Sequence, residues 1–377
     1  MLATKTDITK IKLEPYEPCP CDSGVKFKFC CLKKARDNKR EILIDPTFSD
    51  GRIDHMIKQF WENTDFKTCL AFNQEKCSDD IKNAHSIQNN KILNRISKDS
   101  HVYKFGVNVT QKEAGSSLEL TSKNKASTFF GFCGTHDTEI FRPIEVKEYV
   151  GDSHQNFLFA FRAHSIEHHR RIRKLANIKN IFKQCPYMML EPEVVYTYRV
   201  SQYDVRDLEQ DYKFFKQSYF DSNFDVVRTI HRQLDYEVNF ATCTSFSIED
   251  DLEGKTINEI YSIGHEEMPS IYLNVFPVEG KTNIIISYLS KDEQKYGDYF
   301  EQLDKMTEER LIKYLNYLII QYTENVFFNP TFIDNMSDLQ KESLLKSFDS
   351  SIYPLEMLHL VNDGKYFNFN LFKKDTD

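Results

Sequence analysis

Four cysteines near the start of the chain have the type and spacing of a metal site. The segment from Pro18 to Cys31 contains a Cys-x-Cys pair, an eight-residue loop and a Cys-Cys pair. Four thiolates can surround one divalent ion as a tetrahedron, and the Ser23-Gly24 turn folds the second pair back onto the first. Because so short a segment buries little surface, ion binding would supply its folding energy. The sequence therefore predicts a closed, structural zinc site. Its ligands are Cys19, Cys21, Cys30 and Cys31.

A second group of metal-ligand residues is spread over the middle of the chain. Cys69 and Cys77 are separated by seven residues, and Cys133 and His136 have the spacing of a zinc knuckle. Brought together, these three cysteines and one histidine would make a zinc site. An alternative chemistry uses Cys133 as a thiolate nucleophile and His136 as its base. It is less favoured, because a hydrolase normally takes its base from a distant segment.

Residues 18–31 resemble the SEC-C motif, a small metal-binding module found at the end of the preprotein translocase motor ATPase and attached to many unrelated bacterial proteins. Asp22 and Val25 depart from the family, which usually has Gly and Lys there. The resemblance implies a docking element for protein partners or the ribosome, without chemistry of its own. Residues 1–42 carry ten Lys or Arg and six Asp or Glu, a net charge of +4 that suits an acidic partner or keeps a small module in solution. The matching residues are Cys19, Cys21, Ser23, Gly24, Lys26, Phe27, Lys28, Cys30 and Cys31.

One histidine, His85, is left over beside the second Cys/His group. This combination loosely resembles the HNH-like (ββα-metal) nucleases, which frame their fold with a Cys/His zinc knuckle. The resemblance implies that His85 is a general base that activates water. It also implies that His136 or Asp137, with Glu145, lies near a second ion, Mg²⁺ or Mn²⁺, which stabilises the leaving oxygen. A purely structural zinc site needs fewer assumptions, so both interpretations stay open.

The stretch from Asn156 to Gln184 has no Pro or Gly and carries apolar residues at helical spacing, so we expect a long helix. It contains seven Lys or Arg against the single acid Glu167, a local charge of +6. Such a helix suits nucleic acid, with Arg162 clamping phosphate oxygens and Glu167 binding metal or neutralising a neighbour. His164 and His168, four residues apart, could share an ion. The alternative is a face paired with acids from another helix.

The rest of the chain predicts an α+β fold. We expect strands at 102–109, 116–121, 238–248, 270–276 and 283–289, with a hairpin loop at 277–281. Helical spacing extends over 203–237, and further helices are expected at 293–304, 307–324 and 337–347. The predicted regions are a zinc module at 1–42, a Cys/His region with the basic helix at 43–185, and an α+β region at 186–377.

Composition narrows the class of protein. The 377 residues are 40% hydrophobic and 28% charged, which is typical of globular proteins and excludes a disordered or fibrous chain. The most apolar stretch, 314–322, is too short to span a membrane, and the charged start lacks an apolar signal segment. We therefore expect a cytoplasmic protein with no membrane partner, whose nine cysteines are ligands or thiols. Phosphate-cradling loops, dinucleotide fingerprints and Gly-x-Ser-x-Gly elbows have no match in the sequence.

Two functions follow from these patterns. The first is a cytoplasmic zinc protein that acts on nucleic acid through the basic helix 156–184, as an HNH-like, metal-dependent nuclease of a bacterial defence or toxin system. The second is a non-enzymatic interaction protein that docks on a ribosome or protein partner through residues 1–42. Zn²⁺ is common to both functions, whereas Mg²⁺ or Mn²⁺ belongs only to the first.

Overall fold

The computed structural model describes residues 7–37, 47–78, 80–110, 114–260, 263, 266–352 and 367–374. Residues 1–6 and 38–42 of the predicted N-terminal module lie outside these ranges. The helices are α1 (Cys31–Asp37), α2 (Asp50–Glu62), α3 (Gly134–Glu145), α4 (Ser153–Gln184), α5 (Pro192–Phe220), α6 (Glu293–Asp304), α7 (Glu308–Tyr322), α8 (Pro330–Asp334) and α9 (Asp338–Ile352). The strands are β1 (Ile81–His85), β2 (His101–Val109), β3 (Ala114–Ser122), β4 (Thr128–Cys133), β5 (Val227–Leu234), β6 (Phe240–Phe246), β7 (Ile271–Val278), β8 (Lys281–Leu289) and β9 (Val326–Phe328).

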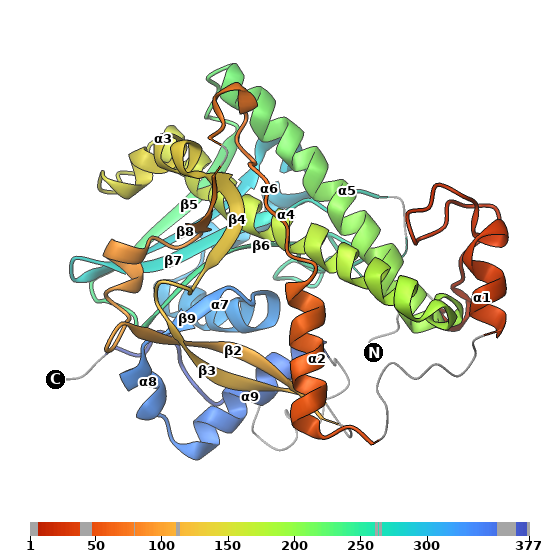
Figure 1. Cartoon of the computed structure of the whole chain (residues 1–377). Coiled ribbons are helices and arrows are strands. Elements are labelled where there is room, and N and C mark those ends of the chain that lie inside the picture. Colours follow the sequence, from red (N-terminus) through yellow and green to blue (C-terminus); the bar gives the residue numbers. More distant parts are fainter. Residues whose placement is uncertain are drawn as a thin grey trace.

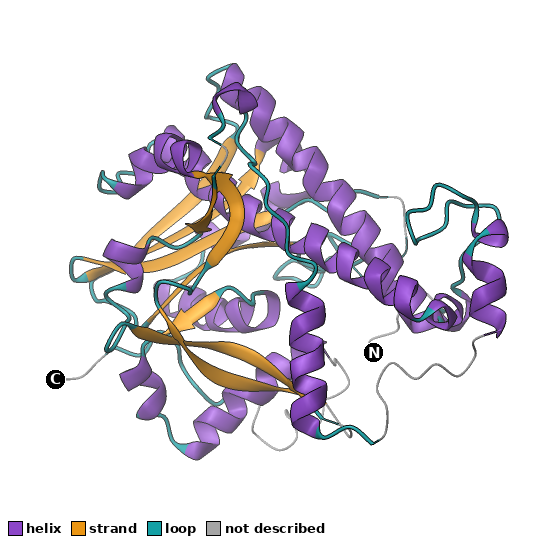
Figure 2. Ribbon diagram, viewed as in Figure 1, coloured by secondary structure: helices purple, strands orange, loops and turns teal. Residues whose placement is uncertain are grey.

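In the described part of the chain, seven strands form one antiparallel sheet in the order β3-β2-β9-β6-β7-β8-β5 (Figure 2). Strands β2 and β3 precede residue 185 and the other five follow it, so the predicted middle and C-terminal regions share this sheet. Helices and strands are mixed along the chain, which confirms the expected α+β class. Among the described residues, no helix combines the length and apolarity that crossing a bilayer requires.

Helices cover both faces of the large sheet. One core joins Phe157 and Phe161 of α4 to Tyr272 and other sheet residues. A second core joins the opposite face, which includes Leu273, to α6, α7 and α9. Tyr272 and Leu273 enter different cores because successive side chains of a strand point to opposite faces. The N-terminal half of α4 is buried on almost every side, as expected of a helix enclosed between layers.

A smaller unit of two strands and a helix lies beside α4. Strands β1 and β4 pair antiparallel, with Ile81 opposite Cys133 at one end and His85 opposite Thr128 at the other. Helix α3 begins directly after β4, at Gly134. Figure 1 shows β4 and α3 near the N-terminal half of α4, and α3 and β4 both contact α4. This β-β-α unit carries Cys133, His136 and His85, whereas Cys69 and Cys77 lie in the chain before it.

The N-terminal module packs on the far end of α4 (Figure 1). Phe27 and Cys31 share a buried cluster with Phe182 of α4 and Val195 of α5. Asp22, one of the two departures from the SEC-C pattern, has a positive φ of 62°, a backbone conformation that explains the usual Gly. Its carboxylate lies 2.8 Å from the Lys179 ammonium and 3.8 Å from that of Lys183. The departure therefore ties the module to α4.

The expectation of a helix over 203–237 is correct only for its first part. Helix α5 ends at Phe220, and Ser222 adopts a positive φ of 52° that breaks the helix. Val227–Leu234 forms strand β5 instead, paired along its whole length with β8. The β-branched residues of this stretch favour a strand when a partner strand is present, which local periodicity does not reveal. The expected strands and the helices at 293–304, 307–324 and 337–347 agree with the structure within a few residues.

The β7–β8 hairpin yields a test of this backbone. Glu279 and Gly280 both have positive φ, 49° and 81°, as a two-residue type I′ turn requires. We expect Gly280→Ala to lower the free energy of unfolding by about 1–2 kcal/mol, because only the left-handed backbone opposes the new Cβ, which meets no atom within 4 Å. Glu279→Asn should raise it by up to about 1 kcal/mol. Gly115→Ala, also in open space but without a positive φ, is the control in urea denaturation. Equal losses for Gly280→Ala and Gly115→Ala would contradict the turn.

Candidate functional site

The four N-terminal cysteines converge. Their sulfur atoms all lie within 4.8 Å of one another and form a group that can hold a metal ion. Cys21 Sγ lies 3.5 Å from Cys30 Sγ, which lies 3.7 Å from Cys31 Sγ. A tetrahedral ion about 2.3 Å from each sulfur separates its ligands by about 3.8 Å. The donor set and its spacing therefore fit such an ion.

Without a bound cation, the thiols of this cluster have very different pKa values. Burial raises the pKa of Cys19 to about 11 and also raises the pKa of Cys31. Burial also acts to raise the pKa of Cys21, but hydrogen bonds with Ser23 and Cys19 outweigh it and lower the pKa to about 6. Four neighbouring thiolates repel one another, so a divalent cation is needed for all four to lose their protons.

The second Cys/His group also converges, from three separate segments. Cys69 and Cys77 come from the chain before β1, Cys133 ends β4 and His136 lies in the first turn of α3. His136 Nδ1 lies 3.5 Å from the sulfur of Cys69, 3.5 Å from that of Cys77 and 3.3 Å from that of Cys133. All four ligand atoms are within 4.8 Å of one another. The predicted set is therefore confirmed as a group that can hold a metal ion.

The geometry argues against Cys133 as a nucleophile. Its side chain has no exposed surface, so a substrate does not reach its sulfur. Its neighbour His136 is equally close to two other sulfurs rather than dedicated to Cys133. Burial raises the pKa of Cys69 to about 12, whereas at Cys133 hydrogen bonds, chiefly with the His136 backbone and Ser78, outweigh burial and lower the pKa to about 6. A shared cation accounts for this set better than catalysis by one thiol does.

His85 lies at the opposite end of the β1–β4 hairpin from this second Cys/His group, opposite Thr128. It is half-buried, and within the described residues its Nε2 atom has no hydrogen-bond partner. Burial lowers its pKa, and the charge of Arg162 lowers it further while that of Glu145 raises it. The imidazole is therefore neutral at pH 7, with a nitrogen available to accept a proton.

Asp137, Glu145 and Arg162 gather around the same region. Burial raises the pKa of Asp137, with the charge of Arg162 lowering it and that of Glu145 raising it, so the two groups that influence His85 also influence Asp137. Asp137 Oδ1 is buried and, among the described residues, has no hydrogen-bond partner. His85, Asp137 and Glu145 are not, however, close enough to form a third preassembled group of metal ligands in the described chain.

Arg162 is the most enclosed member of this cluster, with only 4% of its surface exposed. Its Nη2 atom donates to Glu145 Oε1 at 2.5 Å, and its guanidinium lies 4.2 Å from the centre of the Phe141 ring. Glu145 is at the end of α3, where its carbonyl accepts from Gln88 Nε2 at 2.9 Å. These contacts fix the chain after β1, the end of α3 and the middle of α4 relative to one another.

Glu167 lies apart from this cluster. It is buried, it accepts from Arg170 Nη1 at 3.2 Å, and Thr244 Oγ1 lies 3.5 Å from it. His164 and His168 do not make a metal group with it in the described chain. Most of the helix cations have acidic neighbours, which is the alternative that the sequence left open. The pairs are Arg162–Glu145, Arg170–Glu167, Arg171–Asp204, Arg173–Asp65, Lys179–Asp22 and Lys183–Asp22.

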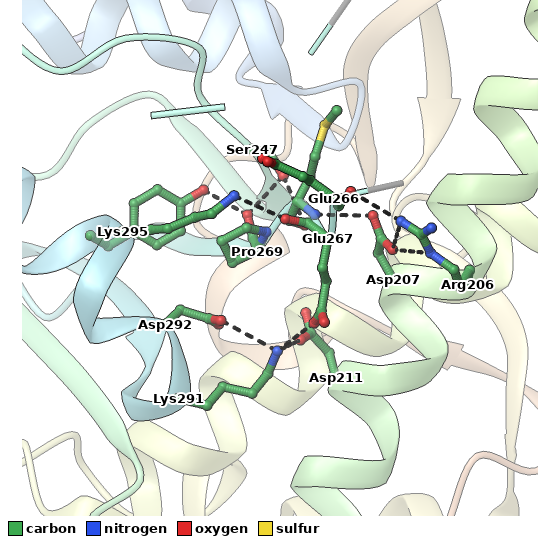
Figure 3. Close-up of polar contacts among 12 residues, drawn as sticks. Arg206, Asp207, Asp211, Ser247, Glu266, Glu267, Pro269, Lys291, Asp292 and Lys295 are labelled. Atoms are coloured by element: carbon green, nitrogen blue, oxygen red, sulfur yellow. Dashed lines mark hydrogen bonds and ion pairs between the residues drawn. The ribbon is translucent and has the colours of Figure 1, made fainter. Parts of the chain in front are cut away.

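Sequence reasoning missed a polar cluster between α5 and the start of α6. Figure 3 shows the Lys291 side chain directed towards Asp211 and Asp292. Its ammonium lies 3.0 Å from Asp211, 2.7 Å from Glu267 and 3.4 Å from Asp292. Burial, partly offset by Lys291, raises the pKa of Asp292 to about 6. The spacing of Asp207 and Asp211 on the inner face of α5 was the available signal. Apart from Arg206, which pairs with Asp207, the partners Met268 and Tyr272 come from segments about 60 residues away.

Comparison with known proteins gives no further guide to this site: no family model, curated protein or solved structure matches the chain. The likeness to the SEC-C motif therefore rests on residues 18–31. The expected likeness to the HNH-like nucleases rests on His85 and the second Cys/His group, and it stays a prediction. Any function has to be argued from their geometry.

Metal analysis tests the two groups separately. We expect the purified protein to hold two equivalents of a thiophilic metal, and Cys21→Ser and Cys77→Ser each to hold one, because a hydroxyl is a poor soft ligand. Both cysteines are only partly buried, so the change leaves little cavity. Cys185→Ala, outside both groups, is the control and should hold two equivalents. The metal is counted by mass spectrometry. Two equivalents of metal in Cys77→Ser would contradict the assignment.

Proposed function

We propose that both groups hold Zn²⁺ and that the chain is a metal-dependent nuclease whose reacting groups surround His85. A set of four cysteines, and a set of three cysteines with one histidine, are typical of structural zinc when their spacings are near those of a tetrahedron. The observation that supports catalysis is the neutral His85, whose Nε2 has no hydrogen-bond partner among the described residues while the ring bonds to the Lys123 backbone. It lies at the end of a β-β-α unit that carries part of the second of these groups. Two paired strands followed by a helix resemble the core of the HNH-like nucleases, although β2 and β3 separate β1 from β4 along the chain.

His85 is the proposed general base. Its lowered pKa keeps the ring neutral at pH 7. Nε2 is buried in the resting structure, so it can take a proton only from a water molecule that enters beside it and attacks phosphorus. The pairing of β1 with β4 holds the imidazole in place. The proton acceptor therefore sits on a strand rather than on a loop, which limits its movement.

Asp137, Glu145 and Arg162 are the proposed electrostatic partners. Asp137 offers a buried oxygen without a partner, which fits Mg²⁺ or Mn²⁺ because these ions need only one or two protein carboxylates and keep several waters. Such a cation would stabilise charge on the phosphate and on the leaving oxygen. The charge of Arg162 acts on Asp137 and on His85, and its hydrogen bond to Glu145 fixes the orientation of its guanidinium.

Cleavage assays test this function. We expect the zinc-loaded protein with Mg²⁺ or Mn²⁺ to cut at least one of single-stranded DNA, duplex DNA and RNA, and His85→Ala to slow cutting by about 10²-fold or more, as loss of a general base does. His55→Ala, an exposed histidine on α2, is the matched control. Because the pKa of His85 lies below 6.5, the rate should fall only as the pH drops below that value. Equal rates for His85→Ala and His55→Ala would refute the role of His85.

A second candidate function is docking through the N-terminal module. Three of its side chains are strongly exposed for apolar residues: Tyr16 at 59%, Val25 at 45% and Phe29 at 67%. Lys28 Nζ lies 5.0 Å from the centre of the Tyr16 ring and donates to its hydroxyl at 2.9 Å. An exposed aromatic surface with lysines suits a partner that is both apolar and acidic, such as a ribosomal surface.

Point substitutions test docking better than deletion of residues 1–42 does. Deletion would uncover Phe182 and Val195, which the module covers, and so promote non-specific association. We expect the full chain to co-sediment with purified ribosomes and Phe29→Ser to weaken this, with metal content unchanged. Phe220→Ser, an exposed aromatic at the end of α5, is the matched control. Undiminished co-sedimentation of Phe29→Ser would reject this surface as the docking element.

A further inference from the structure

A cavity of about 760 Å³ opens beside the C-terminal half of α4. Its wall includes α4, the chain before β4 and the end of α2. The volume lies within the range of sites that hold small organic ligands. Thr128, the register partner of His85, is part of the wall, and paired residues of antiparallel strands lie about 4.5–5.5 Å apart. The cavity therefore adjoins the strand pair that carries the proposed base.

The wall of this cavity is cationic in a protein of net charge −8. It contains six Lys or Arg and three Asp or Glu, an excess of three positive charges. The wall's His169 stays uncharged at pH 7, because burial lowers its pKa. Positive charge inside a concave, low-dielectric surface attracts anions more strongly than the same charge on a convex face. An anionic ligand is therefore the chemistry that this wall favours.

Two of the wall's cations have no ion pair among the described residues. Arg170 and Arg173 are paired with Glu167 and Asp65, two of the acids of the same wall. By contrast, neither the Lys125 nor the Lys174 ammonium makes an ion pair or hydrogen bond with any residue that the structure describes. Burial lowers the pKa of Lys174 and the charge of Arg171 lowers it further, whereas the charges of Asp204 and Glu324 raise it. An anion entering the cavity would add to these two acids in offsetting the cost of burial and the repulsion from Arg171.

Aromatic rings complete the wall. Trp61, 37% exposed, and the partly buried Phe130 lie on it together with Phe129. Arg173 stacks on the Trp61 ring at 4.3 Å and Lys67 lies 5.2 Å from the Phe130 ring, so cations and rings are interleaved. Rings and cations together are what proteins use to hold a nucleobase and its phosphate. A base inside a duplex is stacked and does not enter such a cavity, whereas an unpaired base does.

We propose that this cavity binds an unpaired nucleotide, with its phosphate at Lys125 and Lys174 and its base among Trp61, Phe129 and Phe130. The inference rests on the proposed function for its substrate class, because it makes single-stranded nucleic acid the preferred substrate of the His85 cluster. A free nucleotide has the same base and phosphate as a nucleotide within a strand, and their affinities distinguish the two ligands.

Binding is tested on the zinc-loaded His85→Ala protein, which keeps the cavity and cannot consume the ligand. We expect a fluorescent twelve-nucleotide single strand of DNA or RNA to bind more tightly than the same sequence as a duplex. Lys125→Gln with Lys174→Gln should raise its Kd by about tenfold and reduce the salt dependence of binding, because each lost phosphate contact removes about 0.7 from the slope. Lys216→Gln on α5 removes one charge elsewhere and should change little. Thermal melting checks that each variant folds, and Lys125→Gln alone, at an exposed position, provides a milder version.

The outcomes separate this inference from the proposed function. Strand binding that depends on the two lysines, without cleavage by the wild-type protein, would support the cavity and reject the nuclease. Cleavage that is indifferent to the two lysines would reject the cavity and keep the nuclease. A Kd for AMP or GMP as low as the Kd for the single strand would overturn the strand assignment in favour of a free nucleotide. Equal affinity for strand and duplex would reject the unpaired nucleotide.

Discussion

The packing of α4 is the constraint on which every candidate site depends. Its N-terminal half is enclosed between the large sheet, α3 and α5, so its position and rotation are fixed by apolar contact. Side chains on different faces of α4 therefore contact different parts of the structure. Arg162 reaches the end of α3, Lys174 reaches the cavity, and Lys179 reaches the N-terminal module. A helix held less firmly would not place three separate groups of polar residues with such different surroundings.

Much of the metal chemistry could be predicted because it depends on residue type and spacing. The spacing of Cys133 and His136 is enough to recognise a zinc knuckle from the sequence. Cys69 and Cys77 could be assigned to the same site because four ligands complete a tetrahedron. The prediction of α4 was equally secure, since some thirty residues without Pro or Gly leave few alternatives. Arg162 and Glu145 lie near enough to both His85 and Asp137 to influence their charges, whereas Glu167 lies elsewhere. The catalytic role of this set stays a prediction.

What the sequence could not provide was the identity of partners distant along the chain. The charge of +6 on α4 gave no sign that Asp22, Asp65 and Asp204 would neutralise half of it, because ion pairs between elements leave no local pattern. Strand β5 was taken for helix for a similar reason, since its pairing with β8 lies some fifty residues further on. The cavity and the Lys291 cluster are likewise built from segments that only folding brings together.

The position of Asp22 links the metal to the charge of the longest helix. Asp22 follows Cys21 directly, so its left-handed backbone depends on the loop that the four sulfurs fold. When that loop opens, Lys179 and Lys183 lose the acid beside them, and the tip of α4 gains one net positive charge together with an uncovered apolar surface at Phe182. If the four cysteines hold an ion, its loss would thus change both the tendency to associate and the electrostatic field of the helix that also carries Arg162.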